Sequence, residues 1–76
     1  MKTLEEFKQE IFKAMSRKPS FYRNGQFVFN HIEFEYGVAD AVRIEDGIDC
    51  FYDDSKIDKF IECSYKRLNS EENEIK

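Results

Sequence analysis

The segment VADAVRIEDGIDCFYDD, residues 38–54, decides which fold class we predict for this chain of 76 residues. Apolar residues recur at every second position before and after the dipeptide Asp46-Gly47. A period of two is typical of half-buried strands, and Asp-Gly is a strong signal for a two-residue hairpin turn. We therefore expect two short antiparallel strands, near residues 40–45 and 48–52. A helix over VADAVRI is the alternative that the pattern leaves open.

Two helices are predicted before this hairpin. The first, TLEEFKQEIFKAMSRK, has apolar residues at helical spacing, and Thr3 and Glu6 match a capping box. It should end before Pro19, because the residue preceding a proline disfavours the helical conformation. The second helix should begin between Ser20 and Asn24. Gly37 is a good left-handed terminator for it.

A third helix is predicted after the hairpin, starting at the polar residues 53–55 and running to residue 68. We therefore expect an α+β fold in the order α-α-β-β-α, with a two-stranded antiparallel hairpin packed against three helices. Residues 1–68 should form this single domain, and residues 69–76 a disordered polar tail. Aromatic and aliphatic residues should form most of its core: Phe27, Phe29, Ile32, Phe51, Phe60 and Ile61.

The composition limits the classes of function that fit. A net charge of −4 disfavours general nucleic-acid binding, which usually needs a basic surface. Two cysteines are too few for a disulfide scaffold, the first ten residues lack a signal peptide's apolar run, and no stretch approaches a membrane span. We therefore expect a cytoplasmic protein that does not bind membranes.

The acidic stretch DCFYDDSKIDKF, residues 49–60, invites a metal-binding or catalytic interpretation. A calcium loop needs a glycine at its sixth position, and neither Asp46 nor Asp49 begins a stretch that meets this condition. Adjacent acids at the exposed start of a helix also lack the apolar cleft that raises the pKa of a general acid. We therefore interpret Asp53 and Asp54 as helix caps.

The other chemically active side chains give no motif either. His31 is the only histidine, and its spacing from Cys50 and Cys63 matches neither a zinc site nor a nucleophile–base pair. A single glycine in RNGQ, residues 23–26, does not make a phosphate-binding loop. We therefore expect no enzymatic activity, no catalytic residues, no metal and no cofactor.

Two groups of charged residues remain as candidates for binding and for structure. The acids on or beside the predicted hairpin could meet a protein partner: Asp40, Glu45, Asp46 and Asp49. Arg23 is expected to be structural, joining the second helix to the third through a bidentate pair with Asp53 or Asp54.

The segments RNGQFVFN and DCFYDDSKIDKF, with YGVA between them, also suggest a relationship. This pattern, which covers residues of about 20–61, resembles that of a group of small uncharacterised bacterial and phage-associated proteins. The resemblance implies no catalytic residues. It implies a small stand-alone protein, often encoded on mobile elements, that binds another protein.

The function that we expect is therefore that of a small, acidic, non-enzymatic protein-interaction protein, derived from a phage or prophage and acting on a host protein. A homodimer is compatible with the sequence. The alternative is a winged-helix-like regulatory module that binds nucleic acid. Its third helix would be basic, whereas the third predicted helix begins with acids.

Overall fold

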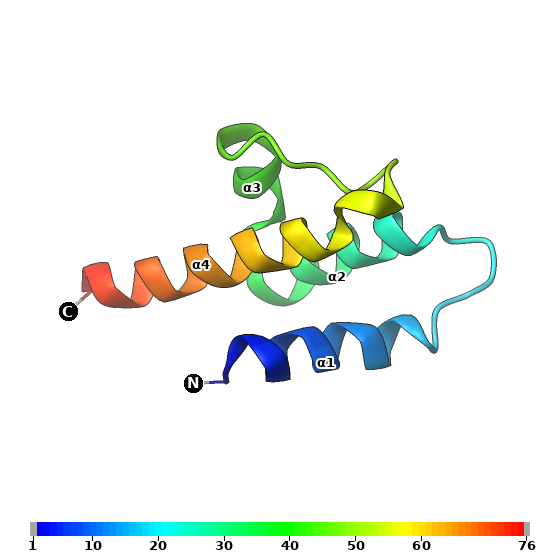
Figure 1. The fold of residues 1–76 in the computed structure, drawn as a ribbon, viewed down its shortest axis with the longest axis horizontal. Coiled ribbons are helices and arrows are strands. Elements are labelled where there is room, and N and C mark those ends of the chain that lie inside the picture. Colours follow the sequence, from blue (N-terminus) through cyan, green and yellow to red (C-terminus); the bar gives the residue numbers. More distant parts are fainter. Residues whose placement is uncertain (1, 76) are drawn as a thin grey trace.

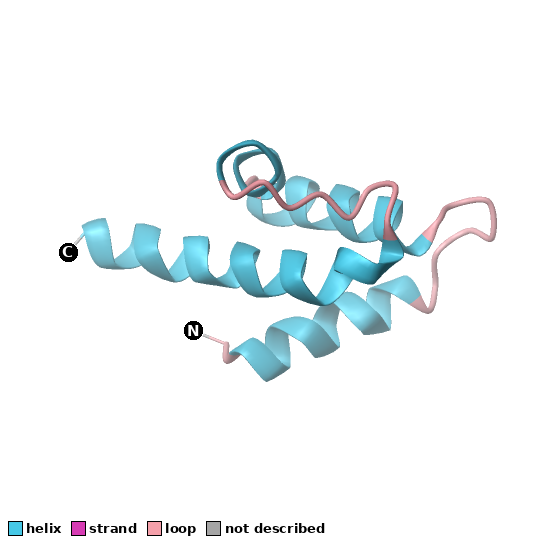
Figure 2. Cartoon of the chain, turned by 45° about the horizontal axis from the view of Figure 1, so that its top comes forward, coloured by secondary structure: helices cyan, strands magenta, loops and turns pink. Residues whose placement is uncertain are grey.

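The computed structural model describes the backbone of residues 2–75 and the side chains of residues 2–69. Within this part of the chain, four α-helices and one 3-10 turn follow one another in the order α1, α2, α3, η1 and α4 (Figure 1). No strand occurs among the described residues, and loops connect all the helices (Figure 2). The prediction of an α+β fold is therefore wrong, and the described chain is all-helical.

Helix α1 spans Leu4–Met15, and the predicted capping box at its start is confirmed. The Thr3 hydroxyl accepts from the Glu6 amide (3.2 Å), and the Glu6 carboxylate accepts from the Thr3 amide (2.8 Å). Two amide groups without partners inside the helix are thereby satisfied. The buried side of α1 presents Phe7 and Ile11 to the other helices.

Helix α2 spans Asn24–Tyr36 and ends at Gly37, as predicted. Gly37 has a φ of 71°, a left-handed conformation that glycine adopts without a steric penalty. The helix contacts α1, α3 and α4, and α4 likewise contacts the other three helices, so these two helices form the centre of the domain. Its buried residues include Val28, Phe29 and Ile32.

Helix α3 spans Ala39–Glu45, where the first strand of the hairpin was expected. Ala39 and Val42, three residues apart, are both buried, whereas Ile44 is 72% exposed. The apolar residues that suggested a strand are thus of two kinds. Val42 lies with Ala39 on the buried side of a helix, and Ile44 is an exposed apolar side chain. The alternative of a helix over VADAVRI is the one that forms.

The Asp46-Gly47 pair ends this helix and does not turn a hairpin. Gly47 has a φ of 71°, and the Ile48 amide donates back to the carbonyl of Val42 (3.4 Å). The same glycine that suits a hairpin turn also suits a helix C-terminus, because both need a positive φ. Residues 46–53 then form a linker that returns to the start of α2 (Figure 1).

The last elements are the turn η1, Asp54–Lys56, and helix α4, Ile57–Ile75. The start of α4 is close to the predicted one. Its inner face buries Ile57, Phe60 and Ile61 together with Ser64. The backbone of α4 extends to Ile75, across most of the expected tail of residues 69–76, and the side chains from residue 70 onward lie outside the described part.

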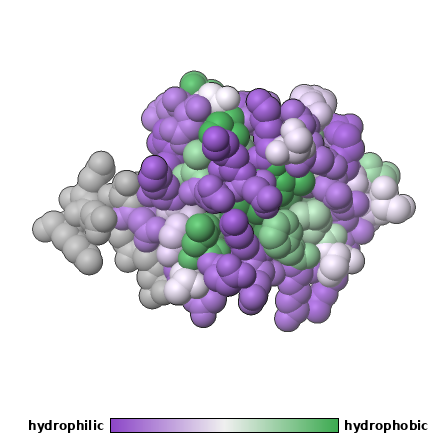
Figure 3. Space-filling view, in the orientation of Figure 1, coloured by the Kyte–Doolittle hydropathy of each residue, from purple (hydrophilic) through white to green (hydrophobic). Residues whose placement is uncertain are grey.

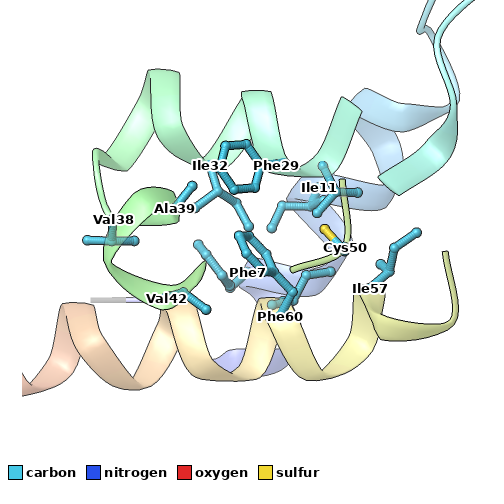
Figure 4. Close-up of a cluster of buried hydrophobic side chains, with 12 residues drawn as sticks. Phe7, Ile11, Phe29, Ile32, Val38, Ala39, Val42, Cys50, Ile57 and Phe60 are labelled. Carbon is cyan, nitrogen blue, oxygen red and sulfur yellow. The ribbon is translucent and has the colours of Figure 1, made fainter. Parts of the chain in front are cut away.

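The core is one cluster of buried apolar side chains from the helices and the linker (Figure 4). The ring of Phe29 lies 5.4 Å from that of Phe60 and 5.6 Å from that of Phe51, measured between centroids. The predicted core residues Phe29, Ile32, Phe60 and Ile61 are buried, whereas Phe27 and Phe51 are only half-buried. Phe7 and Ile11 of α1 complete the interior.

The all-helical architecture also bears on the alternative function. A winged helix needs a β-hairpin as its wing. The described residues contain no such hairpin, so the winged-helix form of a nucleic-acid-binding module loses its structural basis. In addition, none of the helices in the described part has the length and the apolar character that crossing a membrane requires.

Candidate functional site

The two segments of the sequence pattern that suggested a relationship meet in space. Gly25, in the first turn of α2, lies against the linker residue Cys50. A β-carbon built on Gly25 would stand 1.8 Å from the Cys50 carbonyl oxygen. Only glycine permits this approach of two backbones. The Cys50 thiol in turn donates to the Gly25 carbonyl (3.3 Å), so the linker and the helix are joined.

Asp54 caps α2 from 29 positions further along the chain. Its carboxylate accepts a hydrogen bond from the Gly25 amide at 2.8 Å. Arg23 occupies the N-cap position of α2 but makes no side-chain capping bond. The N-terminus of a helix exposes amides without partners and attracts negative charge. Asp54 therefore supplies to α2 the cap that its own preceding residue does not.

We expect the substitution Asp54→Ala to destabilise the protein by about 0.5–2 kcal/mol, the range for a lost helix cap. Asp54→Asn keeps an oxygen acceptor and should therefore retain most of the stability that Asp54→Ala loses. Urea denaturation followed by circular dichroism measures both. If Asp54→Ala unfolds at the same urea concentration as the unsubstituted protein, the remote cap has no energetic role.

Asp53 caps its own turn, as predicted for a helix start. Its carboxylate accepts from the Ser55 hydroxyl (2.6 Å) and from the Ser55 amide (3.0 Å). These two bonds hold the pKa of Asp53 below its usual value. Both predicted caps are therefore caps, but Asp54 serves a different helix from the one that follows it.

Arg23 does not form the expected ion pair with Asp53 or Asp54 among the described residues. Its guanidinium carbon lies 4.9 Å from the centre of the Tyr52 ring and 5.8 Å from that of Phe51. Such cation–π contacts contribute about 0.5–1 kcal/mol at exposed sites. Arg23 thus joins α2 to the linker through aromatic rings and not through a carboxylate.

Aromatic residues flank this arginine, two of them in contact with it on the linker and two directly before it in the chain. We name this group the aromatic corner, and its members are Phe21, Tyr22, Arg23, Phe51 and Tyr52. The rings of Phe21 and Tyr22 lie 4.9 Å apart, and those of Phe51 and Tyr52 lie 4.7 Å apart. Phe21 and Tyr52 are each 79% exposed. In Figure 3, hydrophobic atoms lie at the end of the molecule where the α1–α2 loop projects.

The four acids proposed as a partner-binding face are all used within the chain. Asp40 pairs with Arg43 at 2.9 Å, and the Asp49 carboxylate accepts from the Phe51 amide at 2.9 Å. Glu45 and Asp46 both pair with Arg67 of α4, at 3.0 Å each. Exposed ion pairs like these contribute little stability, typically under about 1 kcal/mol. Only the pairs of Glu45 and Asp46 with Arg67 join α3 to α4, whereas the contacts of Asp40 and Asp49 are local.

A second polar cluster, between α1 and α2, was not predicted from the sequence. The Glu10 carboxylate accepts from the Tyr36 hydroxyl at 2.6 and 2.8 Å, and it lies 3.2 Å from the His31 Nε2 atom. The Lys2 ammonium pairs with the same carboxylate and donates to the Tyr36 hydroxyl at 3.2 Å. His31 therefore has a structural partner, and its ring also stacks on that of Phe27.

This cluster shifts the pKa values of its members. Burial acts to raise the pKa of Glu10, but the hydrogen bonds from Lys2, Tyr36 and His31 prevail and lower it. The hydrogen bond to Glu10 raises the pKa of Lys2 to about 12. Burial, followed by the bond to Glu10, raises the pKa of Tyr36. Glu10 is therefore held as a carboxylate, which suits an anchor between helices.

The lowered pKa of Glu10 predicts how stability depends on pH. A carboxylate with a lowered pKa in the folded state stabilises the protein above the unfolded-state value, near 4.5, and this contribution disappears as pH falls through the folded-state pKa. Glu10→Gln should therefore be less stable than the unsubstituted protein at pH 6, and the difference should shrink toward pH 3. Urea denaturation across this range measures it.

The matched control is Glu5→Gln, at an exposed position of the same helix. It should change stability by under about 0.5 kcal/mol at every pH. A Glu10→Gln difference that is constant from pH 6 to pH 3 would mean that the ionised carboxylate has no special role in the cluster.

Cys50 does not offer a reactive thiolate. Cys50 is fully buried, and burial raises the pKa of its thiol to about 12, so it is not a thiolate at neutral pH. Cys63 is half-buried and is not bonded to Cys50. Across the described residues, no three His, Cys, Asp or Glu side chains lie close enough together to hold a metal ion.

The sequence gives little indication of the Glu10 cluster. Glu10 and His31 lie on predicted helices whose relative rotation the sequence does not give. The aromatic corner gives a clearer signal, because Phe21 and Tyr22 lie in a segment with a proline before it and a helix start after it. Loops often carry binding residues, so two large aromatic residues in a loop indicate a candidate binding surface.

Comparison with protein-family models, with curated proteins and with solved structures gave no match. The resemblance over residues of about 20–61 therefore stays a prediction.

Proposed function

We propose that this protein is a non-enzymatic interaction module that binds another protein through exposed aromatic and aliphatic side chains. The observation that supports the proposal is that four large hydrophobic residues in the described part of so small a domain are more than 70% exposed. Phe34 is 87% exposed, Phe21 and Tyr52 are each 79% exposed, and Ile44 is 72% exposed. Aromatic residues are enriched where proteins bind proteins, and exposed apolar patches mark such sites.

The roles of the polar groups agree with this proposal. Glu10, His31 and Tyr36 bind one another between α1 and α2, and Asp54 binds a helix start. These contacts join elements of the fold, and the Asp54 bond holds the start of α2 to the turn that follows the linker. The origin on a phage or prophage, the action on a host protein and the cytoplasmic location belong to the same proposal and rest on the sequence.

Photo-crosslinking in the native host tests the proposal. The crosslinking amino acid p-benzoylphenylalanine replaces one exposed hydrophobic residue at a time, at positions 21, 34, 44 and 52. Lys66 and Gln9, which are exposed and polar, serve as control positions. We expect a discrete protein adduct from at least one hydrophobic position and none from the controls. Equal labelling at all positions, or no adduct at any, would contradict the proposal.

A further inference from the structure

The loop between α1 and α2 has an unusual distribution of charge for an acidic protein. No Asp or Glu occurs between Glu10 and Glu33, although the chain carries a net charge of −4. The same interval contains four basic residues: Lys13, Arg17, Lys18 and Arg23. The acidic and basic side chains at and beside the loop are therefore all basic, on a molecule whose net charge is negative.

These four basic residues differ in their partners from several other bases of the chain. Lys2 pairs with Glu10, Lys8 of α1 with Glu62, and Arg67 with two acids at the end of α3. Within the described part of the chain, none of the four bases pairs with an acid, and the same holds for Lys56, Lys59 and Lys66. Lys18 donates instead to the Tyr22 carbonyl (2.9 Å), which shapes the loop and leaves the positive charge uncompensated.

We propose that this loop, together with the aromatic corner, is a docking surface for an acidic peptide segment of a partner protein; this inference rests on the proposed function. Arginine binds carboxylates through paired hydrogen bonds, and arginine with tyrosine is typical of the residues that dominate binding. Arg17 and Arg23 meet the carboxylates of the segment. Phe21 and Tyr52 accept its apolar side chains.

The charges that face the corner favour a peptide over a nucleic acid. Three acids lie within three residues of Phe51 or Tyr52 in the chain: Asp49 and Asp53 of the linker and Asp54 directly after it. Asp53 and Asp54 are exposed. A nucleic-acid backbone carries a charge at every nucleotide, so some of its phosphates would meet these carboxylates. A peptide with a few acids can place them at Arg17 and Arg23 and turn apolar side chains toward the linker.

The test is a selection of random 12-residue peptides on the immobilised full chain. The corner variant combines Arg17→Gln with Phe21→Ser, which removes one charge and one exposed ring. The control combines Lys59→Gln with Lys66→Gln, which removes two exposed positive charges from α4 and leaves the exposed hydrophobic residues in place. Circular dichroism melting establishes that both variants fold. We expect selected peptides to be richer in Asp and Glu than the library and to contain an apolar residue.

These peptides should bind the corner variant about tenfold more weakly and the control with unchanged affinity. Their binding to the unsubstituted chain should weaken as salt rises. Selected peptides without excess acid, or equal affinity for the corner variant, would overturn the inference. Tighter binding of a 12-nucleotide single strand at the corner, or dimerisation that the corner variant abolishes in sedimentation, would overturn it as well.

The photo-crosslinking experiment distinguishes this inference from the proposed function. A host protein captured through position 34 or 44, and not through position 21 or 52, would support the interaction function and contradict the docking surface. No capture at any hydrophobic position would contradict the function itself.

Discussion

Gly25→Ala should strongly destabilise the protein. Alanine is the better helix former by about 1 kcal/mol, so propensity alone predicts a gain in stability from this substitution. The new β-carbon, however, would stand 1.8 Å from the Cys50 carbonyl oxygen, far inside van der Waals contact. The linker must move away from α2, and the bond from Cys50 to Gly25 and the cap from Asp54 are lost with it.

The expected cost is about 3 kcal/mol or more, the upper range for overpacking a rigid site. A domain of this size has a free energy of unfolding of about 4–11 kcal/mol in total. Urea denaturation followed by circular dichroism measures the loss. Asn24→Ala, at the adjacent exposed position of α2, is the matched control and should change stability by under about 0.5 kcal/mol. Equal stabilities of the two variants would refute the close approach of the backbones.

Phe60→Ala is the second substitution with a large expected effect. Phe60 is fully buried on α4, and its ring contacts that of Phe29 at the centre of the core. Truncating a buried phenylalanine typically costs about 3–5 kcal/mol, from lost burial and from the cavity that remains. Phe29→Ala should have a similar effect, because Phe29 also touches the linker residue Phe51.

Phe34→Ala is the control for both core substitutions. Phe34 lies on the same helix as Phe29 but is 87% exposed, so its loss should change stability by under about 0.5 kcal/mol. Thermal melting compares the three variants. If Phe60→Ala keeps the melting temperature of the unsubstituted protein, the core is not centred on this ring.

The helix ends that depend on local chemistry could be predicted from the sequence. The Thr3 capping box and the Gly37 terminator need only residues within one turn of the helix end, so their spacing predicts them directly. The buried face of α4 could also be predicted, because Phe60 and Ile61 repeat the helical period together with Ile57.

Helix α3 could not be predicted because its seven residues make only two turns. Over so short a stretch, a helical stripe at Ala39 and Val42 and a strand pattern at Val42 and Ile44 use the same letters. The choice is made by packing against α2 and α4, which bury Ala39 and Val42 and leave Ile44 exposed. Val38, before the helix, supplies no side-chain cap that could have marked its start.

The site shows the same division between local and distant effects. The capping role of Asp53 depends on Ser55, two residues away, and was predicted. The partner of Asp54 is 29 residues distant. The prediction that Asp54 caps a helix was therefore correct, but the helix that it caps was not the one expected. Arg23 was expected to find a carboxylate and lies instead on aromatic rings, because the linker brings Tyr52 to it.

The remote cap of α2 has a consequence for the order of events in folding. Closing a flexible loop between Gly25 and Asp54 costs about 3 kcal/mol of chain entropy, more than the about 0.5–2 kcal/mol that a cap contributes. The cap alone therefore cannot bring the linker to the helix. We therefore expect that burial of Cys50 and of the first turn of α4 brings the linker to the helix, and that the Asp54 bond forms after the rate-limiting step. Loss of that bond should speed unfolding and leave the folding rate almost unchanged.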